Sequence, residues 1–164
     1  MRTPDQFTKS LEEAETACIA YLAAVLGLKP GTNIFRSVNP GLADCGVFDI
    51  GYPFAGELNT FKANVYHFRA QLDLVARDRR WLQAALMAIL GATPVNSQHN
   101  RDSNLRRASN VETFRVAAES GAVTEITTTE IKTEHGDEKV PTFTATVKFD
   151  VVFLAGERTE VPTI

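Results

Sequence analysis

Four polar side chains that alternate along one predicted strand form the densest set of potentially reactive groups in the chain. His67, Arg69, Gln71 and Asp73 occupy every second position, so a strand would project all four from one face. His67 and Asp73 could act as an acid/base pair, but at ~3.3 Å per residue they stand about 20 Å apart and cannot touch. His67 with Arg69, or Arg69 with Asp73, could act together only with help from a neighbouring strand. We interpret the row mainly as a solvated or subunit-facing sheet surface.

A second group of charged residues lies in the segment 92–112, which has almost no apolar periodicity. Its stretch 92–107 contains Arg101, Arg106 and Arg107 against a single acid, Asp102. A loop of this length within a compact domain is typically functional or mobile. Two readings stay open: a plain solvated loop, and a segment that docks on a partner protein through arginine–carboxylate pairs. Three arginines without interleaved aromatic residues do not indicate a nucleic-acid groove.

The spacings that metal, nucleophile and nucleotide chemistry require are not found. His67, His99 and His135 lie far apart, and the chain has no CxxC or HExxH pattern. Cys18 falls on the apolar side of a predicted helix, and Cys45 falls in a predicted turn with no local base to activate it. Nucleophile-elbow, phosphate-loop and dinucleotide-binding glycine motifs are also missing. We therefore expect no catalytic residue, no metal and no cofactor.

Length and charge narrow the classes of function. The chain has 164 residues with 17 basic and 20 acidic side chains, which predicts one globular domain, 1–164, with a net charge of −3. This balance argues against binding nucleic acid or an anionic membrane by bulk charge. No apolar run approaches the roughly 20 residues of a membrane span, and residues 1–6 do not resemble a secretory signal. With only two cysteines, we expect a protein that is cytosolic or assembled in a cytosol.

Two helices are predicted from apolar residues repeated at steps of three and four. The first covers residues 4–26 and stops at Gly27, and Glu15 is expected to lie off its apolar stripe. The second begins after Asp78 as its N-cap and ends at Gly91. Its predicted apolar face consists of Trp81, Leu82, Ala85, Leu86, Ile89 and Leu90.

Strands are predicted from period-two alternation between turn-forming residues. They cover residues 34–38, 47–54, 61–75, 114–118, 123–132 and 143–153. The strand 61–75 changes its apolar parity near residues 64–66, which predicts a bulge there. A polar turn is expected at 135–138 and a short tail at 157–164. Because most strands follow one another directly, we predict an α+β fold: a mostly antiparallel sheet with two helices packed on one face.

In length, acidity and order of elements, the chain resembles the tail terminator or tail-completion proteins of long-tailed bacteriophages. The resemblance rests on the N-terminal helix, the long strand 61–75, the central helix that opens at Asp78, and the closing strands that end with 143–153. It implies a structural virion protein that is not an enzyme. Such a subunit joins a homo-oligomeric ring, typically six-fold, at the head-proximal end of the tail tube. The ring stops polymerisation of the tube protein and joins the head-tail connector or neck protein, in a virion assembled in the host cytoplasm.

Under this resemblance, the polar row and the arginine segment are candidate subunit or partner surfaces. Three alternatives stay open: another neck or connector protein, a generic adaptor of a cellular complex, and a small cone-shaped ligand-binding domain or enzyme. The last alternative predicts an internal cavity of several hundred Å³. Its predicted lining is Tyr66, Phe68, Trp81 and Phe149, with His67 or Asp73 at the mouth.

Overall fold

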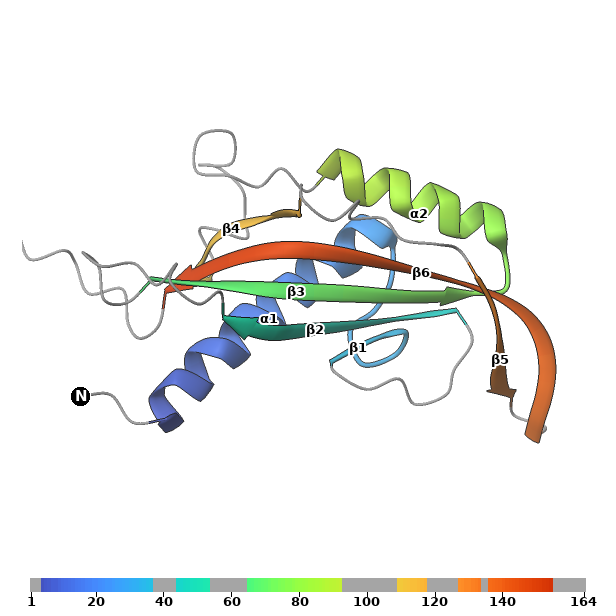
Figure 1. Ribbon diagram of the computed structural model, residues 1–164, viewed down its shortest axis with the longest axis horizontal. Helices are drawn as coiled ribbons and strands as arrows, with labels where there is room; N and C mark the ends of the chain where they lie inside the picture. The colour runs from blue at the N-terminus through green and yellow to red at the C-terminus, as the bar shows by residue number, and fades with distance from the viewer. Residues whose placement is uncertain are drawn as a thin grey trace, which may run out of the picture.

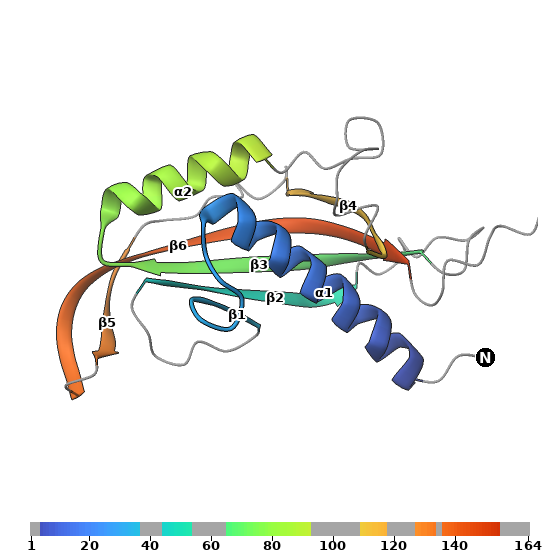
Figure 2. The same cartoon turned by 180° about the vertical axis from the view of Figure 1, so that it is seen from behind.

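Two helices and six strands form two layers in the computed structural model, which describes residues 4–36, 44–53, 65–92, 109–117, 127–133 and 136–154. The strands are β1 (Ile34–Arg36), β2 (Cys45–Pro53), β3 (Val65–Ala76), β4 (Val111–Val116), β5 (Thr127–Thr133) and β6 (Gly136–Leu154). The helices are α1 (Pro4–Leu26) and α2 (Arg79–Ala92). Helix α1 crosses the sheet obliquely, and α2 runs along β3 and β6 (Figures 1 and 2). The predicted α+β fold is confirmed.

Strand β6 has 19 residues and is the strand with which β3, β4 and β5 all pair. The strand order is β1-β2-β3-β6-β4, and β5 also pairs with β6. Strand β3 therefore lies along one edge of β6, while β4 and β5 share the other edge. Every pairing between the described strands is antiparallel except β1 with β2.

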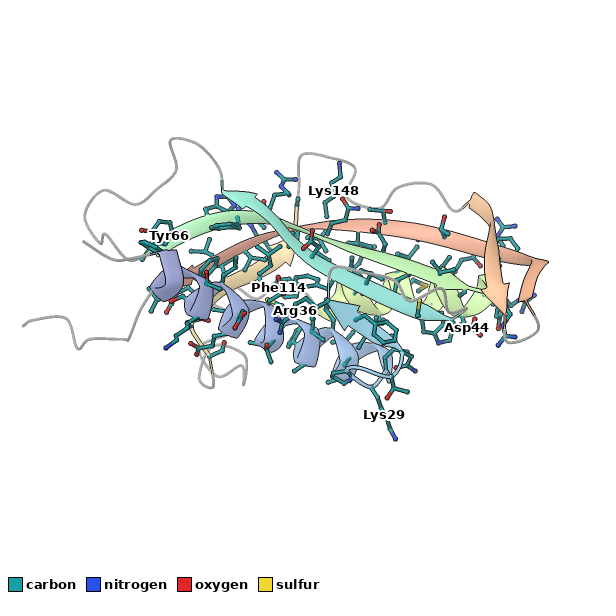
Figure 3. All side chains as sticks on the ribbon, turned by 90° about the horizontal axis from the view of Figure 1, so that it is seen from below. Lys29, Arg36, Asp44, Tyr66, Phe114 and Lys148 are labelled. Carbon is teal, nitrogen blue, oxygen red and sulfur yellow. The ribbon has the colours of Figure 1, made fainter. Side chains whose placement is uncertain are left out.

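The core lies between the two helices and one face of the sheet, which we call the inner face. Strand β3 buries Ala70, Leu72 and Leu74 there, and β6 buries alternate residues from Ala145 to Phe153. Phe114 of β4 belongs to the same cluster and is fully buried. Figure 3 shows it between the sheet and α1. The predicted alternation of apolar and polar residues on both long strands is confirmed.

Helix α1 has the predicted bounds, and its end is closed as expected. Gly27 has a φ of +70°, and the N–H of Leu28 donates to the carbonyl of Ala23 at 2.9 Å, which is a Schellman ending. The expectation that Glu15 lies off the apolar stripe is wrong, because Glu15 is buried. Its carboxylate pairs with Arg36 of β1, with 2.7 Å between Oε1 and Nε, and accepts a backbone hydrogen bond from Ile50. The carboxylate thus ties α1 to two strands.

Burial raises the pKa of Glu15 above its usual 4.5, and the nearby Arg36 charge partly offsets that rise. A folded pKa above the unfolded one means that the folded state holds the proton more tightly. As pH rises between the two values, this group therefore lowers stability. We expect Arg36→Ala to cost about 1–3 kcal/mol near neutral pH, since the buried carboxylate loses its charged partner. The loss should shrink as pH falls and Glu15 becomes protonated.

Urea unfolding of Arg36→Ala across a pH series measures this effect. Glu15→Gln is the matched control, since a neutral amide needs no counter-charge, and in that background Arg36→Ala should have a much smaller effect. An equal loss of stability at all pH values, or an equal loss with and without Glu15, would contradict the assignment.

Several predicted boundaries differ from the structure. Asp78 caps α2 as expected, accepting the N–H of Arg80 at 2.9 Å, but the helix runs past Gly91 to Ala92. Strand β4 begins at Val111, so the non-periodic segment ends earlier than predicted. These shifts arise because a glycine can stay in the last turn of a helix at modest cost and because pairing with β6 recruits the residues before Phe114.

The bulge predicted near residues 64–66 is wrong for the part that the structure describes. Strand β3 pairs regularly with β6 from Val65 to Ala76. The irregularity lies in β2, between Ile50 and Tyr52, at Gly51. Strand β6 also begins at Gly136, so most of the turn predicted at 135–138 is strand.

Candidate functional site

We call the face of the sheet opposite the helices the outer face. It carries the alternate, polar residues of the two long strands β3 and β6. The register places His67, Arg69, Gln71 and Asp73 on it, as their spacing predicts. Lys148 of β6 lies on the same face, and Figure 3 shows it pointing away from the helices. Among the described residues, no helix covers this face (Figures 1 and 3).

Asp73 is held by neutral donors. The Gln71 amide nitrogen donates to both carboxylate oxygens at 3.0 and 3.1 Å. The Thr146 hydroxyl on β6 donates to Oδ1 at 2.7 Å. The pairs of residues that the sequence left open are thus resolved: Asp73 is bound to Gln71 and Thr146, and the partner of His67 and Arg69 comes from β6.

That partner is Asp150, which forms a charged cluster with His67, Arg69 and Arg115. The register sets Asp150 directly opposite Arg69 on β3 and directly opposite Arg115 on β4. Its Oδ1 lies 3.3 Å from His67 Nε2 and 3.4 Å from Arg69 Nε, and its Oδ2 lies 3.7 Å from Arg115 Nε. All three distances exceed the usual 2.7–3.2 Å of N–H···O hydrogen bonds, so Asp150 interacts with Arg69 and Arg115 chiefly through charge.

The charged cluster has more positive than negative groups. One carboxylate, with only 6% of its side chain exposed, faces two guanidinium groups and an imidazole. His67 and Arg69 are largely covered, whereas the Arg115 side chain is 56% exposed. Lys148 stands two residues before Asp150 on the same face and adds another cation. In a chain with a net charge of −3, this part of the outer face thus has a local excess of positive charge, while Asp73 and Asp49 carry negative charge on β3 and β2.

Sequence reasoning identified two members of the cluster and missed Asp150 and Arg115. The alternation along 143–153 placed Asp150 on the polar side of its strand, which was the available signal. The register of β6 against β3 and β4 decides which residues face one another, and alternation alone fixes that register only to within steps of two.

The other residues that the sequence analysis considered lie either outside the described residues or in the core. Arg101, Asp102, Arg106 and Arg107 lie outside the described residues, as do His99 and His135. The expectation that Cys45 sits in a turn is wrong, since it is the buried first residue of β2. Cys18 is buried as predicted, and desolvation raises the pKa of its thiol strongly. Within the described ranges, no three His, Cys, Asp or Glu residues gather into a potential metal site.

The residues proposed for a ligand pocket lie on two different sides of the sheet. Phe68 and Phe149 belong to the inner face and pack in the core, where Phe149 stacks on Phe114. His67 and Asp73 project from the outer face. The sheet therefore separates the predicted lining from the predicted mouth, which disfavours the pocket arrangement.

Helix α2 exposes apolar side chains on the side away from the core. Met87 is 74% exposed and Leu90 is 51% exposed. The prediction that Leu90 belongs to the core face is wrong, because each helical residue turns by about 100°, which carries Leu90 past the buried Ile89. Exposed apolar residues that lie close together are typical of surfaces that bind partners.

Comparisons with known proteins give little further information. No family model and no curated protein matches the chain. Among solved structures, one chain of a structure titled "Virion of native gene transfer agent (GTA) particle" is similar, with 16% sequence identity and a TM-score of 0.42. The match covers 90% of this chain and 97% of that chain. A likeness this low carries no argument about function.

Neither described helix is long and apolar enough to span a membrane.

Proposed function

We propose that the protein is a structural virion protein of a phage or phage-derived tail, in the role of tail terminator. In this role, copies of the chain form a ring at the head-proximal end of the tail tube, stop its polymerisation and present a surface to the connector or neck protein. The protein works by assembly rather than by catalysis. Its partners are further copies of itself, the tail tube protein and the connector.

The observation that carries the proposal is the two-layer architecture with a charged outer face. Both helices pack on the inner face, so the two broad sides of the domain differ in chemistry: helices on one side, and the polar row with the charged cluster on the other. A ring built head-to-tail needs two such different surfaces on each subunit, and it closes when the rotation between copies is right.

The arrangement of the outer face favours assembly over acid/base catalysis. A general acid or base needs a reachable proton position beside the substrate. Here Asp73 accepts hydrogen bonds from Gln71 and Thr146, and Asp150 is buried against Arg69 and Arg115. Side chains fixed in this way are suited to a rigid contact surface.

Deleting the gene from its source genome and imaging the particles by negative-stain electron microscopy tests the proposal. We expect tails of uncontrolled length that fail to join heads. Plasmid-borne wild-type gene should restore finished particles. Tails of normal length that remain unattached to heads would instead identify a neck or connector protein. Normal infectious particles, or a source that makes no particles at all, would refute the virion role.

A further inference from the structure

We propose that the outer face of one copy binds α1 of a second copy, with Arg115 and Lys148 receiving the carboxylates of Glu12 and Glu13. The inference rests on the proposed ring, because it names the two surfaces that meet between neighbouring subunits.

The outer face offers two cations that neighbouring acids can reach. Arg115 is 56% exposed, and its guanidinium lies 3.7 Å from an Asp150 carboxylate that Arg69 and His67 approach more closely. Its charge is therefore only partly balanced. Lys148 is half-exposed and makes no ion pair with a described residue. A guanidinium beside an ammonium group suits a pair of carboxylates.

Helix α1 offers the matching acids. Glu12 and Glu13 are both exposed, and neither makes an ion pair with a described residue. The nearby Glu15 is already engaged by Arg36 within the same chain. Lys9 is the other charged residue exposed on the described part of this stretch, so the patch keeps a net negative charge. Its sign is opposite to that of the β4 side of the outer face, where Arg69, Arg115 and Lys148 surround the single carboxylate of Asp150. The other acids that the register places on this face, Asp73 and Asp49, lie on β3 and β2.

The two patches cannot meet within one chain. Helix α1 packs on the inner face, and its exposed acids lie in the helix layer, while Lys148 points away from the helices on the other side of the sheet (Figure 3). A contact between the patches therefore joins two copies. Because the patches are different, the contact is heterologous, and repeating it from copy to copy produces a ring when the rotation between copies closes.

Charge reversal in the full-length chain tests the contact. One variant carries Arg115→Glu and Lys148→Glu, and the other carries Glu12→Lys and Glu13→Lys. Self-association, followed by mass photometry and sedimentation across a concentration series, should weaken by roughly tenfold or more in each, because like charges then face each other. An equimolar mixture of the two variants should recover association, since every interface again pairs opposite charges.

Two control variants separate the contact from folding and from net charge. Lys148→Glu alone removes no ion pair among the described residues, so it should fold normally and still weaken association. Lys29→Glu makes the same charge change at an exposed position after α1 and should leave association unchanged. Equal effects of Lys29→Glu and Lys148→Glu would overturn the proposal.

Carbodiimide cross-linking of the wild-type chain adds a direct readout. The reagent joins an amine to a carboxylate in contact, so we expect a peptide that links Lys148 to Glu12 or Glu13 in the cross-linked oligomer. Oligomers without this link, or a chain that stays monomeric at every concentration, would overturn the inference. The deletion phenotype stands apart from both results: uncontrolled tails with no such contact would preserve the terminator role and reject only this interface.

Discussion

Replacing Asp150 by alanine is expected to lower the free energy of unfolding by about 3–5 kcal/mol, the range for removing one partner of a buried ion pair. Asp150 is the single carboxylate in the charged cluster, and its side chain is 6% exposed. Without it, the largely covered Arg69 loses the carboxylate that lies 3.4 Å from its Nε. Arg115 is more exposed, so its guanidinium group can turn toward water, and it contributes less to the loss of stability.

Urea unfolding at neutral pH measures the effect, with Asp73→Asn as the matched control. Asp73 sits on the same face, but its described donors are neutral, so the control should lose only about 1–3 kcal/mol. Adding Arg69→Met to Asp150→Ala should recover part of the stability by removing the largely covered guanidinium group that Asp150 faced. An Asp150→Ala loss smaller than that of Asp73→Asn would show that the cluster is effectively solvated.

The polar row illustrates how far alternation predicts a site. Spacing alone placed His67, Arg69, Gln71 and Asp73 on one face, because period two is dictated by strand geometry. It also showed that His67 and Asp73 stay apart. Spacing could not supply Asp150 as the neighbour of His67 and Arg69, since pairing between strands far apart in the chain depends on the packing of the whole inner face.

Glu15 and Leu90 show the corresponding limit of predicting burial from helical periodicity. Both were assigned from helical periodicity, and both lie at the margin of an apolar stripe. At such margins, contacts with neighbouring elements determine whether a side chain is buried. Arg36 and the Ile50 backbone are partners that make the burial of Glu15 possible. Leu90 has turned beyond the sheet and remains exposed. The helix bounds themselves depend on local signals, Gly27 and Asp78, and these were predictable.

The sequence placed Trp81 on the apolar face of the second helix, and the structure leaves it partly buried at the margin of the cluster. Phe114 holds the central place, although its short strand gave a weaker signal. The difference arises because β4 enters the core only through its pairing with β6. A residue whose burial depends on a distant strand is the hardest to rank from sequence.

We therefore expect Phe114→Ala to cost about 3–5 kcal/mol, the usual range for truncating a buried phenylalanine. Its ring is fully buried and stacks on Phe149, with 4.7 Å between centroids. It also meets Phe48 and Tyr21 edge-on, each at 6.0 Å. The cavity would open between α1 and three strands at once, where no single neighbour can collapse into it.

Unfolding can be followed by the fluorescence of Trp81, the only tryptophan, which lies on α2 and does not report on β4 alone. Val116→Ala is the matched control, because Val116 shares the strand and the inner face but is only half-buried, and it should lose less than half as much. Since Phe114 and Arg115 are consecutive, loosening β4 should also withdraw Arg115 from Asp150. We therefore expect Phe114→Ala and Arg115→Gln to be less than additive, and strictly additive losses would show that core and outer face are independent.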